Sequence, residues 1–141
     1  MVNQVLNEIT KSLHGRFGDD CRYYVEAIEQ NVKTPCFTVG VLNPISRSVN
    51  SKDYYRTVPC VLHYYSNDRT NTLNDCYAIG EAVLDALEYL TVGGRTIRAE
   101  NMSYMMVDDV LEIFLTYRFW TEKFGSTTPM EGVEIQNKSV V

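Results

Sequence analysis

Residues 53–68, DYYRTVPCVLHYYSND, form the most informative strand-like segment of the sequence. Side chains of a strand alternate between its two faces, which places Val58, Cys60 and Leu62 on one face and Val61 and His63 on the other. Neither face is plainly polar. We therefore expect both faces to be covered, one by a helix and the other by a further element.

Pro59 lies in the middle of this segment. Proline has no N–H to donate to a neighbouring strand and is found on edge strands or at bulges. The sequence therefore predicts an edge strand or a bulge here. An open edge is a place where another subunit can pair.

The rest of the chain divides into helical and strand-like segments. Apolar residues repeat with helical spacing over 2–14 and again over 71–90, which predicts two amphipathic helices. Alternation predicts strands at 22–27, 35–42, 95–106 and 109–121, and the polar stretch 43–53 predicts a hairpin tip or exposed loop. Since short connections favour antiparallel neighbours, we predict an α+β fold, α-β-β-β-α-β-β, with a single mixed or antiparallel sheet of about five strands and both helices on one face.

At 141 residues the chain has the length of one domain. We place that domain at residues 1–124. The composition changes after Phe124, and residues 125–141 have no usable periodicity, so we expect them to form a mobile or partner-bound tail.

The net charge of −5 argues against generic binding to DNA or to an anionic membrane, since proteins that grip phosphates supply Lys and Arg. No apolar run is long enough to span a membrane, and the polar start, MVNQVLNEITK, lacks the features of a signal peptide, which predicts a cytosolic protein. The four cysteines include no C-x-x-C pair, so we expect no metal site and buried, reduced thiols.

Candidates for catalysis are few. Strand parity places Cys60 and His63 on opposite faces, which disfavours a nucleophile–base pair. The adjacent carboxylates at 19–20 and 108–109 fall at predicted turns, where Asp is common for turn geometry alone. We therefore expect no catalytic residue, no cofactor and no enzymatic activity. One alternative stays open, a small cytosolic enzyme or ligand-binding module centred on His63 and the neighbouring tyrosines.

Large amphipathic side chains indicate contacts with other subunits. Tyrosine, tryptophan and arginine are enriched at the energetic centres of protein interfaces. Among the residues that the pattern turns outward, or that lie in the projecting 43–53 loop, we take the following as candidates for a subunit or partner interface: Arg47, Lys52, Tyr55, Arg56, Tyr65, Arg118 and Trp120.

Three segments together resemble a known family: YVEAIEQNVKTPCFTVGVLNP, then YYRTVPCVLHYYSND before the second helix, then VDDVLEIFLTYRFW near the end. Over residues 1–122 the chain is similar to the tail terminator, or tail completion, proteins of phages and prophages of Gram-positive bacteria. The tail after Phe124 has no counterpart in that pattern.

The resemblance implies a structural virion protein at the neck end of the tail, made in the host cytoplasm. It implies a ring of six copies that caps the tail tube, ends its polymerisation and meets the head–tail connector, with the sheath as a further partner in a contractile tail. Unlike surfaces for such a ring are expected at the Pro59 strand and the 43–53 loop. DNA would pass through the lumen without sequence-specific contacts, which suits an acidic subunit. A head-completion or neck adaptor is the alternative from the same particle.

Overall fold

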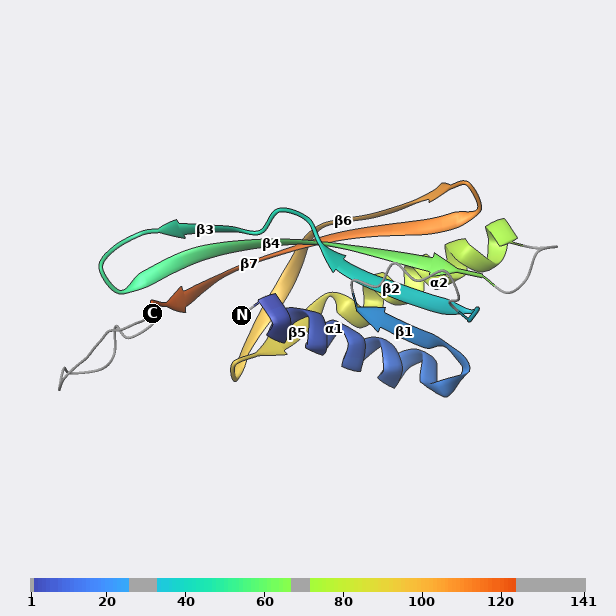
Figure 1. Ribbon diagram of the computed structural model, residues 1–141, viewed down its shortest axis with the longest axis horizontal. Coiled ribbons are helices and arrows are strands. Elements are labelled where there is room, and N and C mark those ends of the chain that lie inside the picture. The colour runs from blue at the N-terminus through green and yellow to red at the C-terminus, as the bar shows by residue number, and fades with distance from the viewer. Residues whose placement is uncertain (1, 26–32, 67–71, 124–141) are drawn as a thin grey trace.

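The computed structural model describes residues 2–25, 33–66 and 72–123 and consists of a sheet with two helices beneath it (Figure 1). In chain order the elements are α1 (Val2–Phe17), the short 3-10 helix η1 (Gly18–Asp20), β1 (Arg22–Val25), β2 (Cys36–Val41), β3 (Ile45–Ser48), β4 (Asp53–Tyr65), α2 (Thr72–Leu87), β5 (Tyr89–Val92), β6 (Arg95–Val107) and β7 (Val110–Glu122). The predicted α+β class is confirmed. The predicted tail, 125–141, lies outside the described residues.

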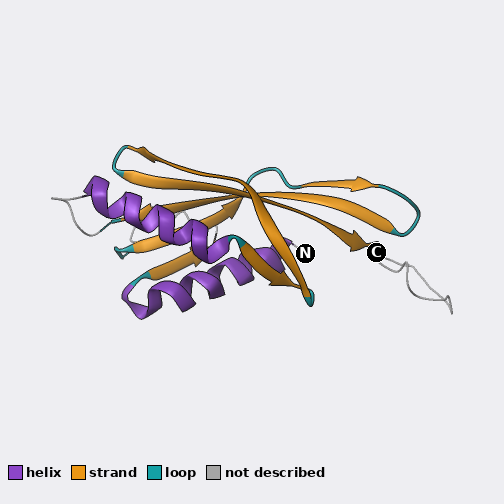
Figure 2. Cartoon of the chain, turned by 180° about the vertical axis from the view of Figure 1, so that it is seen from behind, coloured by secondary structure: helices purple, strands orange, loops and turns teal. Residues whose placement is uncertain are grey.

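The sheet has seven strands in the order β1-β2-β4-β7-β6-β5, with β3 as a further neighbour of β4. Among the strands that the structure describes, β1 and β2 pair in parallel and the other pairs are antiparallel. β4 and β7 pair along their whole length, from Asp53 opposite Glu122 to Tyr65 opposite Val110. These two long strands run side by side through the middle of the sheet (Figure 2).

Both helices cover the same face of the sheet, as predicted. The apolar stripe of α1 is buried at Val5, Leu6, Ile9 and Leu13. β4 buries its even-numbered residues from Val58 to Tyr64 on the face that the helices cover. Its odd-numbered residues, on the other face, stay partly exposed. The expectation of a cover on both faces is thus wrong for the part of the chain that the structure describes, because the odd-numbered residues of β4 stay partly exposed.

Two strands were missed by the sequence analysis. β3 lies inside the predicted loop, and its four residues, ISRS, are all exposed, so no burial pattern marks them. The strand forms because the side-chain oxygen of Asn50 accepts hydrogen bonds from the backbone N–H groups of Lys52 and Asp53, which closes a hairpin.

β5 begins within the last two residues of the predicted helix 71–90 and continues to Val92. The helix ends at Leu87, and residues 89–92 then pair with 95–98 of β6. Gly93 and Gly94 form a two-residue hairpin turn between β5 and β6, with φ of +60° and +78°. Positive φ at both central residues is the requirement of this kind of turn, and glycine meets it without steric cost.

Of the two alternatives predicted for Pro59, an edge strand or a bulge, the edge strand is wrong, because β4 is flanked by β7 on one side and by β2 and β3 on the other. The carbonyl of Pro59 accepts a hydrogen bond from the N–H of Leu42, so the missing donor points toward the β2–β3 connection. Val41, at the end of β2, pairs with Cys60, and Ile45, at the start of β3, pairs with Thr57. Between these two pairs the β2–β3 segment moves on by four residues and β4 by three. The ladder is interrupted at that point, so proline costs no strand–strand hydrogen bond.

Candidate functional site: a basic aromatic arm

One end of the sheet extends past both helices as a three-stranded arm (Figures 1 and 2). We define the arm as residues 45–58, which contain β3 and the first part of β4, and residues 118–123, which contain the end of β7. Within it only Val58, Phe119 and Thr121 are buried. The arm therefore presents two sheet faces and two strand edges to its surroundings.

On the face of the arm away from the helices, three side chains form one row across the strands. Arg47 of β3 lies opposite Tyr55 of β4, and Tyr55 lies opposite Trp120 of β7. The Arg47 guanidinium is 5.8 Å from the centre of the Tyr55 ring, and the Tyr55 and Trp120 rings are 5.1 Å apart. Trp120 is 46% exposed. Such a row is the composition expected of an interface centre.

The other face of the arm is held together by Arg56. Its Nε donates a hydrogen bond to the Thr121 hydroxyl at 2.6 Å, and its Nη1 donates one to the Ser46 hydroxyl at 2.8 Å. The same guanidinium is 5.1 Å from the centre of the Tyr54 ring, which Lys123 also approaches, at 5.2 Å. Because these contacts join β3, β4 and β7, they fix the three strands as one unit.

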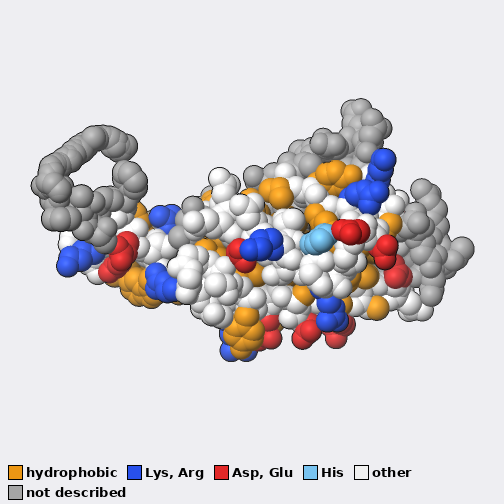
Figure 3. Space-filling model, turned by 90° about the horizontal axis from the view of Figure 1, so that it is seen from below, with side chains coloured by type: hydrophobic (Ala, Val, Ile, Leu, Met, Phe, Trp, Pro, Cys, Tyr) orange, Lys and Arg blue, Asp and Glu red, His pale blue; other side chains and the backbone are white. Residues whose placement is uncertain are grey.

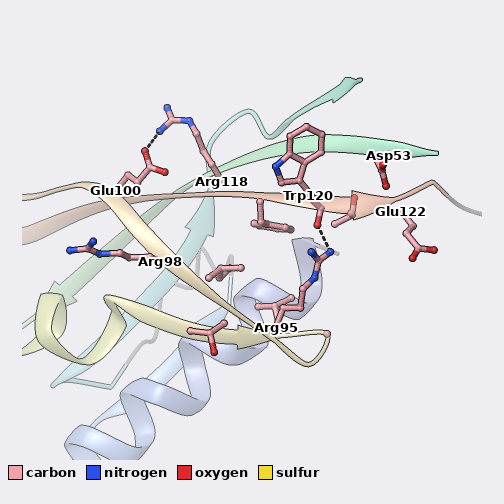
Figure 4. Close-up of a pocket in the computed structure, with 13 residues that line it drawn as sticks. Asp53, Arg95, Arg98, Glu100, Arg118, Trp120 and Glu122 are labelled. Carbon is pink, nitrogen blue, oxygen red and sulfur yellow. Dashed lines mark hydrogen bonds and ion pairs between the residues drawn. The ribbon is translucent and has the colours of Figure 1, made fainter. Parts of the chain in front are cut away.

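A groove runs along the β7 side of the arm. β6 pairs with β7 as far as Ala99 opposite Tyr117 and then turns away to meet β5. The opening that it leaves has a volume of about 820 Å³ and is lined by residues 118–122 of β7 and by the start of β6. Figure 4 shows Arg95 crossing this groove, and its Nη2 donates a hydrogen bond to the Trp120 carbonyl at 2.6 Å.

The other two guanidinium groups of the groove have carboxylate partners. Arg118 lies 2.9 Å from Glu100 and Arg98 lies 2.9 Å from Glu88. The hydrogen bond to Glu88 raises the pKa of Arg98. With each guanidinium engaged, the groove is not arranged as a site for a small anion.

The arm is the basic part of an acidic chain. Five cations and two carboxylates give it a formal charge of +3, while the whole chain carries −5; the charged residues of the arm are Arg47, Lys52, Arg56, Arg118, Lys123, Asp53 and Glu122. Figure 3, which views the molecule from below, shows Lys and Arg side chains at the arm end, on the left. Electrostatic attraction to an acidic surface is the direct consequence.

The structure gathers six of the seven predicted interface residues on the arm: Arg47, Lys52, Tyr55, Arg56, Arg118 and Trp120. Tyr65 lies at the other end of β4, ten residues from Tyr55, which is about 33 Å along a strand. Its ring contacts His63 instead, at 6.4 Å between centres. The sequence analysis did not single out Tyr54, Lys123 or Arg95, because their roles depend on which strands become neighbours.

The sites considered for catalysis are separated in the fold. Cys60 is buried under the helices, and burial raises its pKa to about 12, while His63 lies on the opposite face of β4, as strand parity predicted. His63 Nε2 is 3.6 Å from a Glu112 carboxylate oxygen and its Nδ1 is 3.4 Å from the Thr38 hydroxyl. It does not line the groove beside the arm.

The paired carboxylates lie at turns, as predicted: Asp19 and Asp20 in η1, and Asp108 and Asp109 between β6 and β7. Over residues 2–25, 33–66 and 72–123, the structure brings no three potential metal ligands together. Within the same ranges, each helix is too short or too polar to cross a membrane.

Comparison with known protein families adds the decisive observation. Residues 4–129 match a family described as "Phage tail terminator protein". The chain belongs to this phage tail terminator family. The match covers most of the chain, and it reaches beyond residue 122, where the resemblance was expected to end. Membership of the family gives this tail terminator protein a structural role in the phage tail.

The other comparisons add little. A search of curated proteins finds no match to this terminator. A solved structure that covers 84% of this chain and 95% of its own has 16% sequence identity and a TM-score of 0.34. At that score the similarity carries no argument about the fold or the role of the terminator.

Proposed function

We propose that this terminator forms a ring, of six copies, that caps the growing end of the tail tube, stops its polymerisation and presents a surface to the head–tail connector. The family match over residues 4–129 carries the proposal. Assembly takes place in the host cytoplasm before the tail joins the head, and in a contractile tail the ring also contacts the sheath.

The arm is the surface that we assign to subunit and partner contacts. It combines an exposed cross-strand row, Arg47, Tyr55 and Trp120, with a formal charge of +3 on a chain of −5. Tyrosine and tryptophan side chains lose little conformational entropy for the area that they bury, and together with arginine they are enriched at the energetic centres of interfaces. In this proposal Lys52, Arg56 and Arg118 support the row, and Tyr65, at the far end of β4, serves a separate contact.

The proposal includes no catalytic activity. His63 faces Glu112 and Thr38 on the open face of the sheet, whereas the nearest thiol along the same strand, that of Cys60, lies on the buried face. A nucleophile needs a base within hydrogen-bond reach. We therefore expect His63→Ala to leave tube capping unchanged, and substrate turnover by the isolated chain that is lost in this variant would contradict a purely structural role.

The test is to mix the purified chain with isolated tail tubes and separately with head connectors, and to locate it by electron microscopy with a gold label. Capping of tube ends, with loss of further tube growth, is the expected result. Binding to connectors alone would instead support a head-completion or neck adaptor. Trp120→Ala is expected to abolish capping. Lys11→Ala, at a side chain that is 74% exposed on α1, is the matched control and should cap normally.

A further inference from the structure

The arm has an unpaired edge on each side. β3 pairs with β4 on one side only, and within the described residues its other side has no strand neighbour. On the opposite side of the arm, residues 118–122 of β7 pair with β4 but not with β6, whose last partner in β7 is Tyr117. Exposed backbone donors and acceptors of this kind are templates for pairing with another chain.

Hydrogen bonds already formed show which backbone groups point outward. The N–H of Val49 donates to the Asp53 carbonyl, so odd-numbered residues of β3 face β4 and Ser46 and Ser48 face away. The N–H of Lys123 donates to the Lys52 carbonyl, so odd-numbered residues at the end of β7 face β4. Even-numbered residues 118, 120 and 122 therefore turn their backbone groups into the groove.

The Trp120 carbonyl shows that this outer edge accepts hydrogen bonds, because the Arg95 guanidinium already donates to it at 2.6 Å. A carbonyl oxygen has two lone pairs and can accept a second donor. The groove alongside, of about 820 Å³, borders this same stretch of β7. A strand paired with this edge would lie roughly 4.8 Å from β7, in this groove, where it would share the Trp120 carbonyl with Arg95 or displace that side chain.

The two edges match in length, direction and charge. β3 offers four residues and the open part of β7 offers five. Both strands run antiparallel to β4 and hence parallel to each other. β3 carries the cation Arg47, and the groove is lined at its end by the carboxylates of Asp53 and Glu122. Among the described residues, no side-chain cation lies within ion-pair distance of these two carboxylates.

We propose that β3 of one copy pairs with residues 118–122 of β7 in the next copy, so that the arms form a continuous sheet between subunits. The contact joins two different surfaces, which is the heterologous geometry that closes into a ring. Copies of the chain related by rotation about an axis roughly parallel to these strands keep their strands pointing the same way. β3 of one copy and β7 of the next would therefore pair in parallel. The inference rests on the proposed ring and names the backbone surfaces that would hold it together.

Proline substitutions test the edges separately. Ser48→Pro removes an outward N–H from β3, and Glu122→Pro removes one from the β7 edge, while both leave the bonds to β4 in place. Ser48→Ala and Glu122→Ala keep the N–H and are the matched controls. Association is measured by native mass spectrometry, alone and with tail tubes added, after circular dichroism has shown that each variant is folded.

The expected result is that each proline variant associates about tenfold or more weakly than the wild type, while both alanine variants assemble normally. A mixture of the two proline variants should give a one-to-one pair and no ring, because Ser48→Pro still offers an intact β7 edge and Glu122→Pro an intact β3 edge.

Three outcomes would overturn the inference in distinguishable ways. Normal rings from both proline variants would leave the proposed ring in place but remove edge pairing as its cause. Pairs formed by Glu122→Pro alone would show that two β3 edges meet symmetrically. A wild-type chain that associates neither alone nor on tubes would overturn the proposed ring together with the inference.

Discussion

Gly80 of α2 packs closely against the Tyr104 ring of β6. A Cβ atom at this position would lie 2.9 Å from Cδ2 and 3.0 Å from Cγ of Tyr104 on β6. These atoms lie at the end of the ring that is attached to Cβ, and the hydroxyl at the other end donates a hydrogen bond to Glu81 at 2.8 Å. The ring is therefore held at both ends, and Gly80→Ala should force a shift of the helix or the ring.

Two opposing effects set the magnitude. Alanine is a better helix former than glycine by about 0.8–1.0 kcal/mol. Overpacking costs about 1–3 kcal/mol. In the wild-type background we therefore expect Gly80→Ala to lower the free energy of unfolding by as much as about 2 kcal/mol. In a Tyr104→Ala background the clash is absent, and the same substitution should raise stability by about 0.8–1.0 kcal/mol.

Urea unfolding of the four proteins, followed by far-UV circular dichroism, completes the double-mutant cycle. The decisive quantity is the difference between the two Gly80→Ala effects, expected at about 1–3 kcal/mol. A stabilisation of equal size in both backgrounds would refute the steric reasoning and show that the helix tolerates a methyl group at this position.

Three further predictions follow from buried groups and from the arm. Tyr117→Phe should cost about 1–3 kcal/mol of unfolding free energy, because the Tyr117 hydroxyl donates to the buried Leu87 carbonyl, which ends α2; an unchanged urea midpoint would mean that this carbonyl finds another donor. Alkaline pH should destabilise the fold, since burial raises the pKa of Cys60 from 9.0 to about 12 and, with smaller effects of nearby anionic groups, that of Tyr23 from 10.0 to about 12. The unfolded chain loses these protons first, so stability present below about pH 9 should fall as the pH rises toward 12, and a flat plot of urea midpoint against pH would contradict this. Trp120→Ala should cost only about 0.2–1 kcal/mol of stability, the usual value of a cross-strand pair, so loss of tube capping without unfolding, seen by thermal melts, would separate the interface role of Trp120 from a folding role.

Strand parity was the most dependable sequence signal. Alternation along β4 correctly placed Cys60 and His63 on opposite faces, because successive side chains of a strand point to opposite sides. Which of the two faces stays open was not predicted. The apolar stripe of α1 was equally reliable, since Val5 and Leu13 lie on one side of any regular helix.

The same reasoning failed where local pattern carries little information. β3 has no buried residue, so its existence depends on the Asn50 turn and on a partner strand already in place. β5 continues the apolar spacing of α2, and only its pairing with residues 95–98 makes it a strand. For Pro59 the sequence left an edge strand and a bulge both open, because it does not show that a neighbouring ladder is interrupted opposite the proline.

For this tail terminator protein, the order of residues alone determined the two helices, the long strands and which residues of a strand share a face. These properties depend on spacings of two to four residues. The tertiary structure decided that Arg47, Tyr55 and Trp120 form one row and that the arm has two open edges. Residues as far apart as 47 and 120 become neighbours only through strand pairing, which the burial of the opposite face selects and no local pattern encodes.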